Sequence, residues 1–292
     1  MMLSTLLLGL AVIAVWVPGI RTPWGRIAAW LPLLGGALLS AAVQQLVDGR
    51  GLAAVAVVLA LALAVASMEA RPAGLRRAAK LGTVLLCFAL GLSKLPGFVP
   101  FVFVGDTVVS AGAPPMRLAL RFDAGIAGLV LLAFYGRRIA TWAELKAVAR
   151  PTLLIASATT VVVMGLGLAM GYVAFDPKWP WFAAGHLLKI LLATCVLEEM
   201  FFRGVIQQAL ADWAPVRERP ALKWLPLIAA SLLFGAVHAP GGAALAGLAT
   251  VAGLGYGAAW QATQRIEAAI AVHFAVNAVH FVAFTYPALL RA

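Results

Sequence analysis

The chain is poor in charge and has almost no cysteine. Only 11% of its 292 residues are Asp, Glu, Lys or Arg, whereas 63% are hydrophobic. That balance excludes a soluble globular domain. The two cysteines, Cys87 and Cys195, both lie inside apolar stretches, so the sequence offers no disulfide framework and favours two buried thiols.

Acidic residues are scarcer than basic ones: 11 Asp and Glu face 22 Lys and Arg, for a net charge of +11. Nucleic-acid binding would gather the basic residues in one patch or stripe. Here they lie in short connections between apolar stretches, as Lys and Arg do on the cytoplasmic side of membrane proteins. We therefore expect the lipid bilayer as a partner and no nucleic acid.

Long apolar stretches recur from one end of the chain to the other. No ten-residue alternation typical of a membrane barrel is present, and backbone hydrogen bonding in lipid then leaves helices. We predict an all-α, polytopic transmembrane helical bundle with about ten spans. The expected spans are residues 2–20, 27–47, 51–68, 79–94, 119–136, 152–174, 181–211, 222–239, 243–263 and 266–288.

Basic residues between the spans predict the topology. They are densest in the connections at residues 71–80 and 137–150, which we therefore expect in the cytoplasm. Residues 95–104 are apolar but broken by two prolines and too short to span. For this stretch the sequence fits either an apolar loop on other helices or a re-entrant segment.

Three closely spaced charged residues lie in the second half of the seventh expected span: Glu198, Glu199 and Arg203. Ionisable groups at membrane depth are costly and indicate a functional site. Glu199 and Arg203 are four residues apart, so on a helix they share a face and form a pair. Glu198 faces about 100° away from that pair. The spacing predicts one carboxylate that orients the site and one that acts chemically.

Two further polar patches follow within apolar sequence. His238 comes four residues after Phe234, at the end of the eighth expected span. His273 and Asn277 are also four residues apart and share one face of the last span, with His280 on nearly the same face. Each histidine alone also fits a packing role, but polar groups on three helices together favour a site.

The expected depth of these groups agrees in part. If the seventh and eighth spans are antiparallel and joined near residues 212–221, Glu198 and His238 both lie about 20–25 Å from that connection. His273 comes only about eight residues into the last span, so its depth agrees less well and requires a longer or tilted helix.

The ordered motifs EExxxR, FxxxH and HxxxN resemble those of the CPBP family of intramembrane proteases. That family includes CAAX prenyl-protein endopeptidases, related to the eukaryotic Ras-converting enzyme, and bacteriocin-processing or immunity proteins. All three motifs are complete here, at residues 198–203, 234–238 and 273–277. The resemblance implies a hydrolase of the bacterial inner membrane that cleaves a membrane-associated or lipidated protein or peptide.

The resemblance also implies roles for the motif residues. Glu198 would act as the general base for a water molecule, with help from His238. His273 and Asn277 would donate hydrogen bonds to the oxyanion, and the pair Glu199–Arg203 would stabilise the helix. Residues 1–150 would be additional helices of unassigned role, and residues 151–292 the protease core. No cofactor and no metal are implied. The implied site is Glu198, Glu199, Arg203, His238, His273 and Asn277.

Other functions fit the same residues. Glu198, His238 and His273 form a possible His₂Glu zinc set, which would make the chain a membrane metalloprotease, although HExxH is absent. The polar groups also fit a helix lock in a non-catalytic membrane partner or chaperone, or a proton relay in a transporter. Their confinement to the last third of the chain, without an internal repeat, argues against transport.

Overall fold

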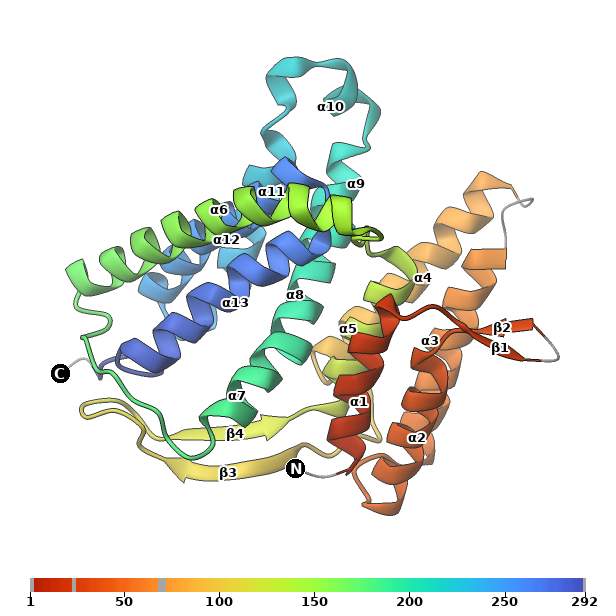
Figure 1. Cartoon of the computed structure of the whole chain (residues 1–292), viewed down its shortest axis with the longest axis horizontal. Coiled ribbons are helices and arrows are strands. Elements are labelled where there is room, and N and C mark those ends of the chain that lie inside the picture. The colour runs from red at the N-terminus through yellow and green to blue at the C-terminus, as the bar shows by residue number, and fades with distance from the viewer. Residues whose placement is uncertain (1–2, 23–24, 68–71, 291–292) are drawn as a thin grey trace. The chain divides into compact units, whose positions relative to one another are not determined.

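The computed structural model describes residues 3–22, 25–67 and 72–290, most of them helical (Figure 1). The chain forms two compact units. The first comprises Met1–Phe103, Ala119–Gly136 and Leu192–Glu198, and the second comprises Val104–Leu118, Arg137–Leu191 and Glu199–Ala292. One helical run therefore contributes to both units.

The first unit is built from helices around α5. Within it α1 packs on α2 and α5, and α4 packs on α3 and α5. Its glycines let helices approach closely: a Cβ on Gly128 would lie 3.2 Å from the Leu197 backbone. The elements are α1 (Leu3–Ile13), η1 (Ala14–Trp16), β1 (Ile20–Thr22), β2 (Gly25–Ile27), α2 (Trp30–Val43), α3 (Gly49–Ser67), α4 (Ala73–Gly91) and α5 (Phe122–Tyr135).

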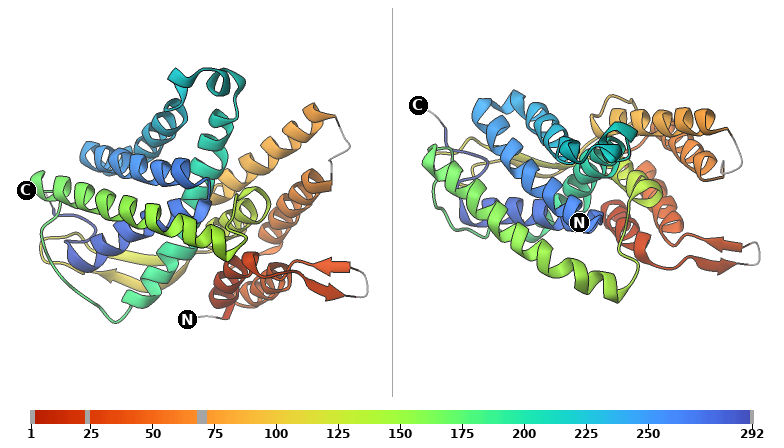
Figure 2. Two further views of the ribbon diagram at one scale, coloured as in Figure 1. Left: turned by 45° about the horizontal axis from the view of Figure 1, so that its top comes forward. Right: turned by 90° about the horizontal axis from the view of Figure 1, so that it is seen from above.

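The second unit gathers four long helices. In it α12 packs on α6, α11 and α13, and α13 also packs on α6, as the views of Figure 2 agree. Its core mixes aromatic rings with small aliphatic residues. The elements are α6 (Trp142–Ala169), α10 (Ala214–Glu218), η4 (Pro220–Leu222), α11 (Leu225–Val237), η5 (Ala239–Gly241), α12 (Ala243–Thr263) and α13 (Ile266–Ala283).

One helical run, residues 183–211, carries the first polar motif. Two of its segments are π-helical, with wider turns than an α-helix, and such turns occur frequently at functional sites. The run consists of α7 (Ala183–Lys189), η2 (Ile190–Cys195), α8 (Val196–Glu199), η3 (Met200–Gln207) and α9 (Gln208–Ala211).

The structure confirms a largely helical membrane protein, but not the count of ten spans. Each of the ten expected stretches contains helix. Within the described residues, however, only five helices are both long and apolar enough to cross a membrane, at residues 49–67, 142–169, 220–237, 243–263 and 266–283. Helical segments at 3–16, 30–43 and 122–135 are apolar but shorter.

The expectation of an all-α fold needs a correction. Two short hairpins are present: β1 pairs with β2, and β3 (Phe101–Thr107) pairs with β4 (Met116–Leu120). β3 takes up residues 101–104 of the proline-broken stretch, and residues 95–100 before it form a loop. Its alternating Phe and Val residues favour a strand, because aromatic and β-branched side chains fit a pleated surface.

The two basic connections are also more helical than expected. Arg76, Arg77 and Lys80 lie in the first turns of α4, and Arg71 lies outside the described residues. α6 begins at Trp142, because Thr141 caps it by accepting a hydrogen bond from the Glu144 amide. That start lies ten residues before the expected span. The cytoplasmic placement of these connections stays a prediction.

Candidate functional site

A buried ion pair stands at the start of η3. Arg203 donates from Nη1 to Oε1 of Glu199 at 3.1 Å, and both side chains are fully buried. The four-residue spacing thus produces the predicted pair. Breaking such a pair leaves the remaining charge uncompensated in a medium that solvates it poorly. The pair therefore makes the local structure depend on both residues together.

Aromatic rings enclose the guanidinium of this pair. The Arg203 Cζ lies 4.9 Å from the ring centroid of Phe234, 5.3 Å from that of Tyr256 and 5.8 Å from that of Phe202. A cation over a ring face gains electrostatic attraction that grows when water is excluded. Arg203 also donates from Nη2 to the Gly253 carbonyl at 2.8 Å, which ties η3 to α12.

His273 joins the pair from α13. Its Nδ1 donates to Oε1 of Glu199 at 2.7 Å, across 74 residues of sequence. The contact brings His273 to the first motif, although the residue count along the spans put His273 less deep than Glu198. We call Glu199, Arg203 and His273 the buried lock. The bond to the carboxylate fixes Nδ1 as the donor of this contact.

His238 lies at the C-terminal end of α11 and is partly buried. Its Nδ1 donates to the Phe234 carbonyl at 2.7 Å, because a carbonyl oxygen only accepts. In a neutral imidazole this hydrogen bond leaves Nε2 as an acceptor. The Phe234 ring lies 4.7 Å from the His238 ring and 5.7 Å from the His273 ring, so the second and third motifs meet at one aromatic side chain.

The remaining motif residues are two partly buried side chains, one on α8 and one on α13. Asn277 is partly buried and lies one helical turn after His273 on α13. Glu198 is partly buried and directly precedes Glu199 in α8. Within the described residues no three or more His, Cys, Asp or Glu side chains gather in a way that could hold a metal ion.

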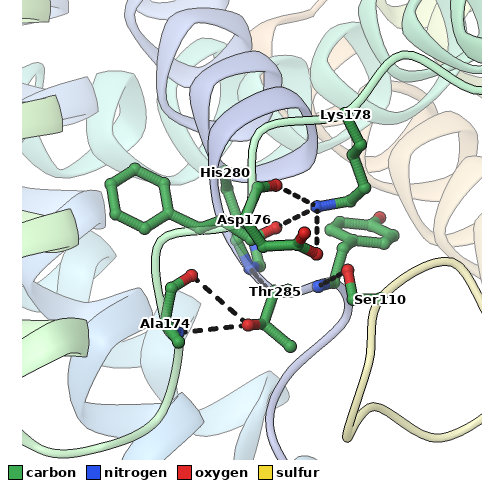
Figure 3. A network of polar contacts seen from close by, with 8 residues as sticks. Ser110, Ala174, Asp176, Lys178, His280 and Thr285 are labelled. Carbon is green, nitrogen blue, oxygen red and sulfur yellow. Dashed lines mark hydrogen bonds and ion pairs between the residues drawn. The ribbon is translucent and has the colours of Figure 1, made fainter.

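The end of α13 is held by polar contacts shown in Figure 3. Lys178 donates from Nζ to the Asp176 carboxylate at 3.3 Å and also to the Phe284 carbonyl. The hydroxyl of Ser110 and the ammonium of Lys178 hold the pKa of the Asp176 carboxyl below its usual value. These contacts fasten the connection before α7 to the chain that follows α13.

His280 belongs to this fastening. Its Nε2 donates to the Thr285 carbonyl at 3.2 Å, and its ring lies 5.0 Å from the Tyr286 ring. Thr285 in turn bonds the Ala174 backbone, and burial raises the pKa of Tyr286 to about 12. Of the two readings of His280, these contacts favour packing over a role as an oxyanion donor.

Sequence reasoning missed several residues of the site. Gln207 is fully buried and donates from Nε2 to the Gly257 carbonyl at 3.1 Å. Tyr256 stacks on His273 with ring centroids 4.4 Å apart and planes 12° apart. The sequence contains a signal for both residues. Gln207 continues the four-residue period of Glu199 and Arg203, and the glycines on either side of Tyr256, Gly253 and Gly257, are also four residues apart.

Residues 179–279 match the family model described as type II CAAX prenyl endopeptidase Rce1-like. The match covers about a third of the chain and includes all three polar motifs. It confirms the CAAX protease resemblance over this segment. Over this segment the chain is similar to CAAX proteases, and five described helices long and apolar enough to cross a membrane indicate an integral membrane protein. No curated protein and no solved structure matches the chain.

Proposed function

We propose that this protein is an intramembrane endopeptidase that hydrolyses a peptide bond of a membrane-associated protein substrate. The observation that carries the proposal is the hydrogen bond between His273 and Glu199, which ties the third motif to the first. We place the protease core in residues 151–292 and assign the earlier helices no role in the chemistry. We further propose the bacterial inner membrane as its location.

In the proposed reaction Glu198 is the general base. It takes a proton from a water molecule whose oxygen attacks the carbonyl carbon of the scissile bond. The neutral His238 accepts a hydrogen bond from the same water through Nε2, which the bond to Phe234 leaves as an acceptor. Glu198 then returns the proton to the leaving amine nitrogen as the carbon–nitrogen bond breaks.

The oxyanion of the tetrahedral intermediate is assigned to donors on α13. Asn277 donates from its amide, and His273 donates from Nε2. The proton on Nδ1 of His273 makes the hydrogen bond to Glu199. Donation from Nε2 therefore requires a second proton on the ring. Glu199 then sits between two cations, Arg203 and the imidazolium, and stabilises both. Donors aimed at developing charge contribute strongly in a site that excludes water.

The test uses the purified full-length chain in liposomes and a fluorescence-quenched, farnesylated peptide that ends in a CAAX sequence. Glu198→Gln keeps the shape of the side chain but removes the base, so we expect hydrolysis to fall by about 10²–10⁴-fold. Glu218→Gln, the same change at an exposed residue of α10, is the control and should hydrolyse like wild type. His238→Ala should be nearly as damaging as Glu198→Gln.

A metal chelator distinguishes the proposal from a zinc enzyme. We expect full activity in the chelator. Activity that vanished and returned with Zn²⁺, or hydrolysis that persisted in Glu198→Gln, would contradict the proposed mechanism. If the farnesylated peptide is not cleaved by the wild type, quantitative proteomics of membranes that carry wild type or Glu198→Gln should identify an uncut precursor that accumulates in the variant.

A further inference from the structure

The imidazole of His273 is constrained in two independent ways. The hydrogen bond from Nδ1 to Glu199 fixes one ring atom at 2.7 Å. The parallel stack with Tyr256 fixes the ring plane, and Phe234 meets the ring edge-on at 89°. The terminal torsion of histidine is otherwise broad, so without the stack the ring could rotate about its Cβ–Cγ bond, which would open the Nδ1 bond more often and redirect Nε2. The direction of Nε2 therefore depends on where Tyr256 lies.

The position of Tyr256 is set by the register of α12 against η3. Two side chains of η3 donate to carbonyls of α12, Arg203 to Gly253 and Gln207 to Gly257, and each bond joins residues 50 apart in sequence. Equal separations mean that the two segments run in the same direction in one register. Tyr256 lies between the two accepting residues, so sliding α12 would break both bonds and move its ring.

Both accepting positions are glycines for a physical reason. A Cβ on Gly253 would lie 3.2 Å from Nη2 of Arg203, and a Cβ on Gly257 would lie 2.9 Å from Oε1 of Gln207. A Cβ at Gly257 would therefore make the Gln207 amide shift, and a Cβ at Gly253 would be tight against the Arg203 guanidinium. Oε1 of Gln207 has no hydrogen-bond partner among the described residues. A buried amide with one unsatisfied atom is a costly choice for filling space, which favours a positional role.

We propose that Tyr256 and Gln207 are positioning residues for His273. Gln207, together with Arg203, fixes the register of α12, and Tyr256 transmits that register to the imidazole plane. The consequence for catalysis rests on the proposed function, because Nε2 of His273 is there the oxyanion donor. The positioning itself can be measured without turnover.

The experiment observes the histidine rings of the full-length chain in lipid nanodiscs by ¹⁵N nuclear magnetic resonance. The chain has four histidines, so ring signals are few, and the His273 signal is the one lost in His273→Gln. The measured quantity is the rate at which its Nδ1 proton exchanges with solvent. We expect Tyr256→Leu to raise this rate by about 3- to 10-fold, the factor that corresponds to the loss of one aromatic pair. Tyr256→Phe, which keeps the ring, should retain the wild-type rate.

A matched pair of glycine variants tests the register. Gly257→Ala should raise the exchange rate by a similar factor, because its methyl group displaces Gln207. Gly247→Ala, on the same helix, should not change it, because a Cβ there meets nothing within 4 Å. This pair and Gln207→Leu carry the test if Tyr256→Leu does not fold. Wild-type exchange in both Gly257→Ala and Gln207→Leu would overturn the proposal.

Peptide hydrolysis adds a second readout. In Gly257→Ala we expect kcat to fall by about 10-fold or more with KM unchanged, since misplacement of a catalytic group affects the transition state. The two proposals fail differently. Faster ring exchange in a chain whose wild type cleaves nothing would support the positioning and contradict the proposed function. If the wild type cleaves the peptide but the variants leave the exchange rate unchanged, the proposed function is supported and the positioning is contradicted.

Discussion

The two units each contain a buried carboxylate with an arginine beside it. Asp123, in the first turn of α5, accepts hydrogen bonds from the Ser93 hydroxyl and the Ala124 amide, and Arg121 lies 3.5 Å away. That arginine side chain is 37% exposed. Glu199 accepts from two ionisable side chains, Arg203 and His273, both of them buried. The two carboxylates are similar in burial and opposite in what compensates their charge.

We interpret the difference as that between a structural contact at Asp123 and the proposed site at Glu199. A hydroxyl and a backbone amide satisfy Asp123 without taking part in proton transfer, and solvent shares the charge of its arginine. Glu199 depends on a fully buried guanidinium and on the imidazole of His273. Loss of a charge from the buried lock is therefore felt by the fold and by the site at once, whereas a change at Asp123 remains local.

The largest effect should come from breaking the buried lock. Glu199→Gln or Arg203→Ala should lower the free energy of unfolding by about 3–5 kcal/mol, because each leaves a buried charge uncompensated. Asp123→Asn should cost only about 1–3 kcal/mol, the range for one disturbed buried hydrogen bond. Denaturant titration of the full chain in detergent measures both. Equal losses in the free energy of unfolding for the two carboxylate variants would contradict the proposed difference between them.

Asn277→Ala should distinguish a residue needed for hydrolysis from one needed for folding, which refines the comparison of the two carboxylates. Hydrolysis should fall by about 10²–10³-fold, the usual loss for one oxyanion donor, while the unfolding transition stays close to wild type. Asn277 is partly buried and lies outside the ion pair, so its removal leaves no charge uncompensated. The measurement is kcat beside an unfolding curve on the same preparation. A large loss of stability with little loss of kcat would show that Asn277 supports the fold and does not stabilise the oxyanion.

His280→Ala should have a smaller effect on hydrolysis, less than about threefold, well below the loss expected for an oxyanion donor. The contacts of His280 with Thr285 and Tyr286 fasten the chain after α13 and do not involve the lock. Steady-state kinetics on the farnesylated peptide checks this, with His273→Ala as the comparison. A loss as large as that of His273→Ala would bring His280 into the site.

The smallest effect concerns pH at the fastening of Figure 3. Because the pKa of Asp176 is lowered in the folded chain, its contribution to stability is present above the ordinary aspartate pKa, about 3.9, and is lost as pH falls through the lowered value. Hydrogen exchange of residues 172–178 should therefore accelerate in acid in the wild type but not in Asp176→Asn. Ser110→Ala should move the loss to higher pH. An identical acid response in wild type and Asp176→Asn would contradict this assignment.

Features that depend on local geometry could be predicted from the residues alone. Apolar stretches became helices, because a membrane leaves few other ways to satisfy the backbone. The four-residue spacing of Glu199 and Arg203 gave an ion pair, since that spacing puts two side chains on one helix face. The three motifs also indicated the CAAX protease segment. Helix ends were less predictable: α6 begins ten residues early through the Thr141 cap, and β3 follows a side-chain pattern that hydropathy alone does not detect.

Only the tertiary structure decided which groups meet. The bond from His273 to Glu199 joins positions 74 residues apart, and a simple count of helical rise put His273 less deep than the first motif. The stack of Tyr256 on that histidine depends on a register fixed by Arg203 and Gln207 against two glycines. Periodicity states the face on which a side chain lies, but not its neighbour. The neighbour follows from close packing of separate helices, where one missing Cβ is enough to choose the register.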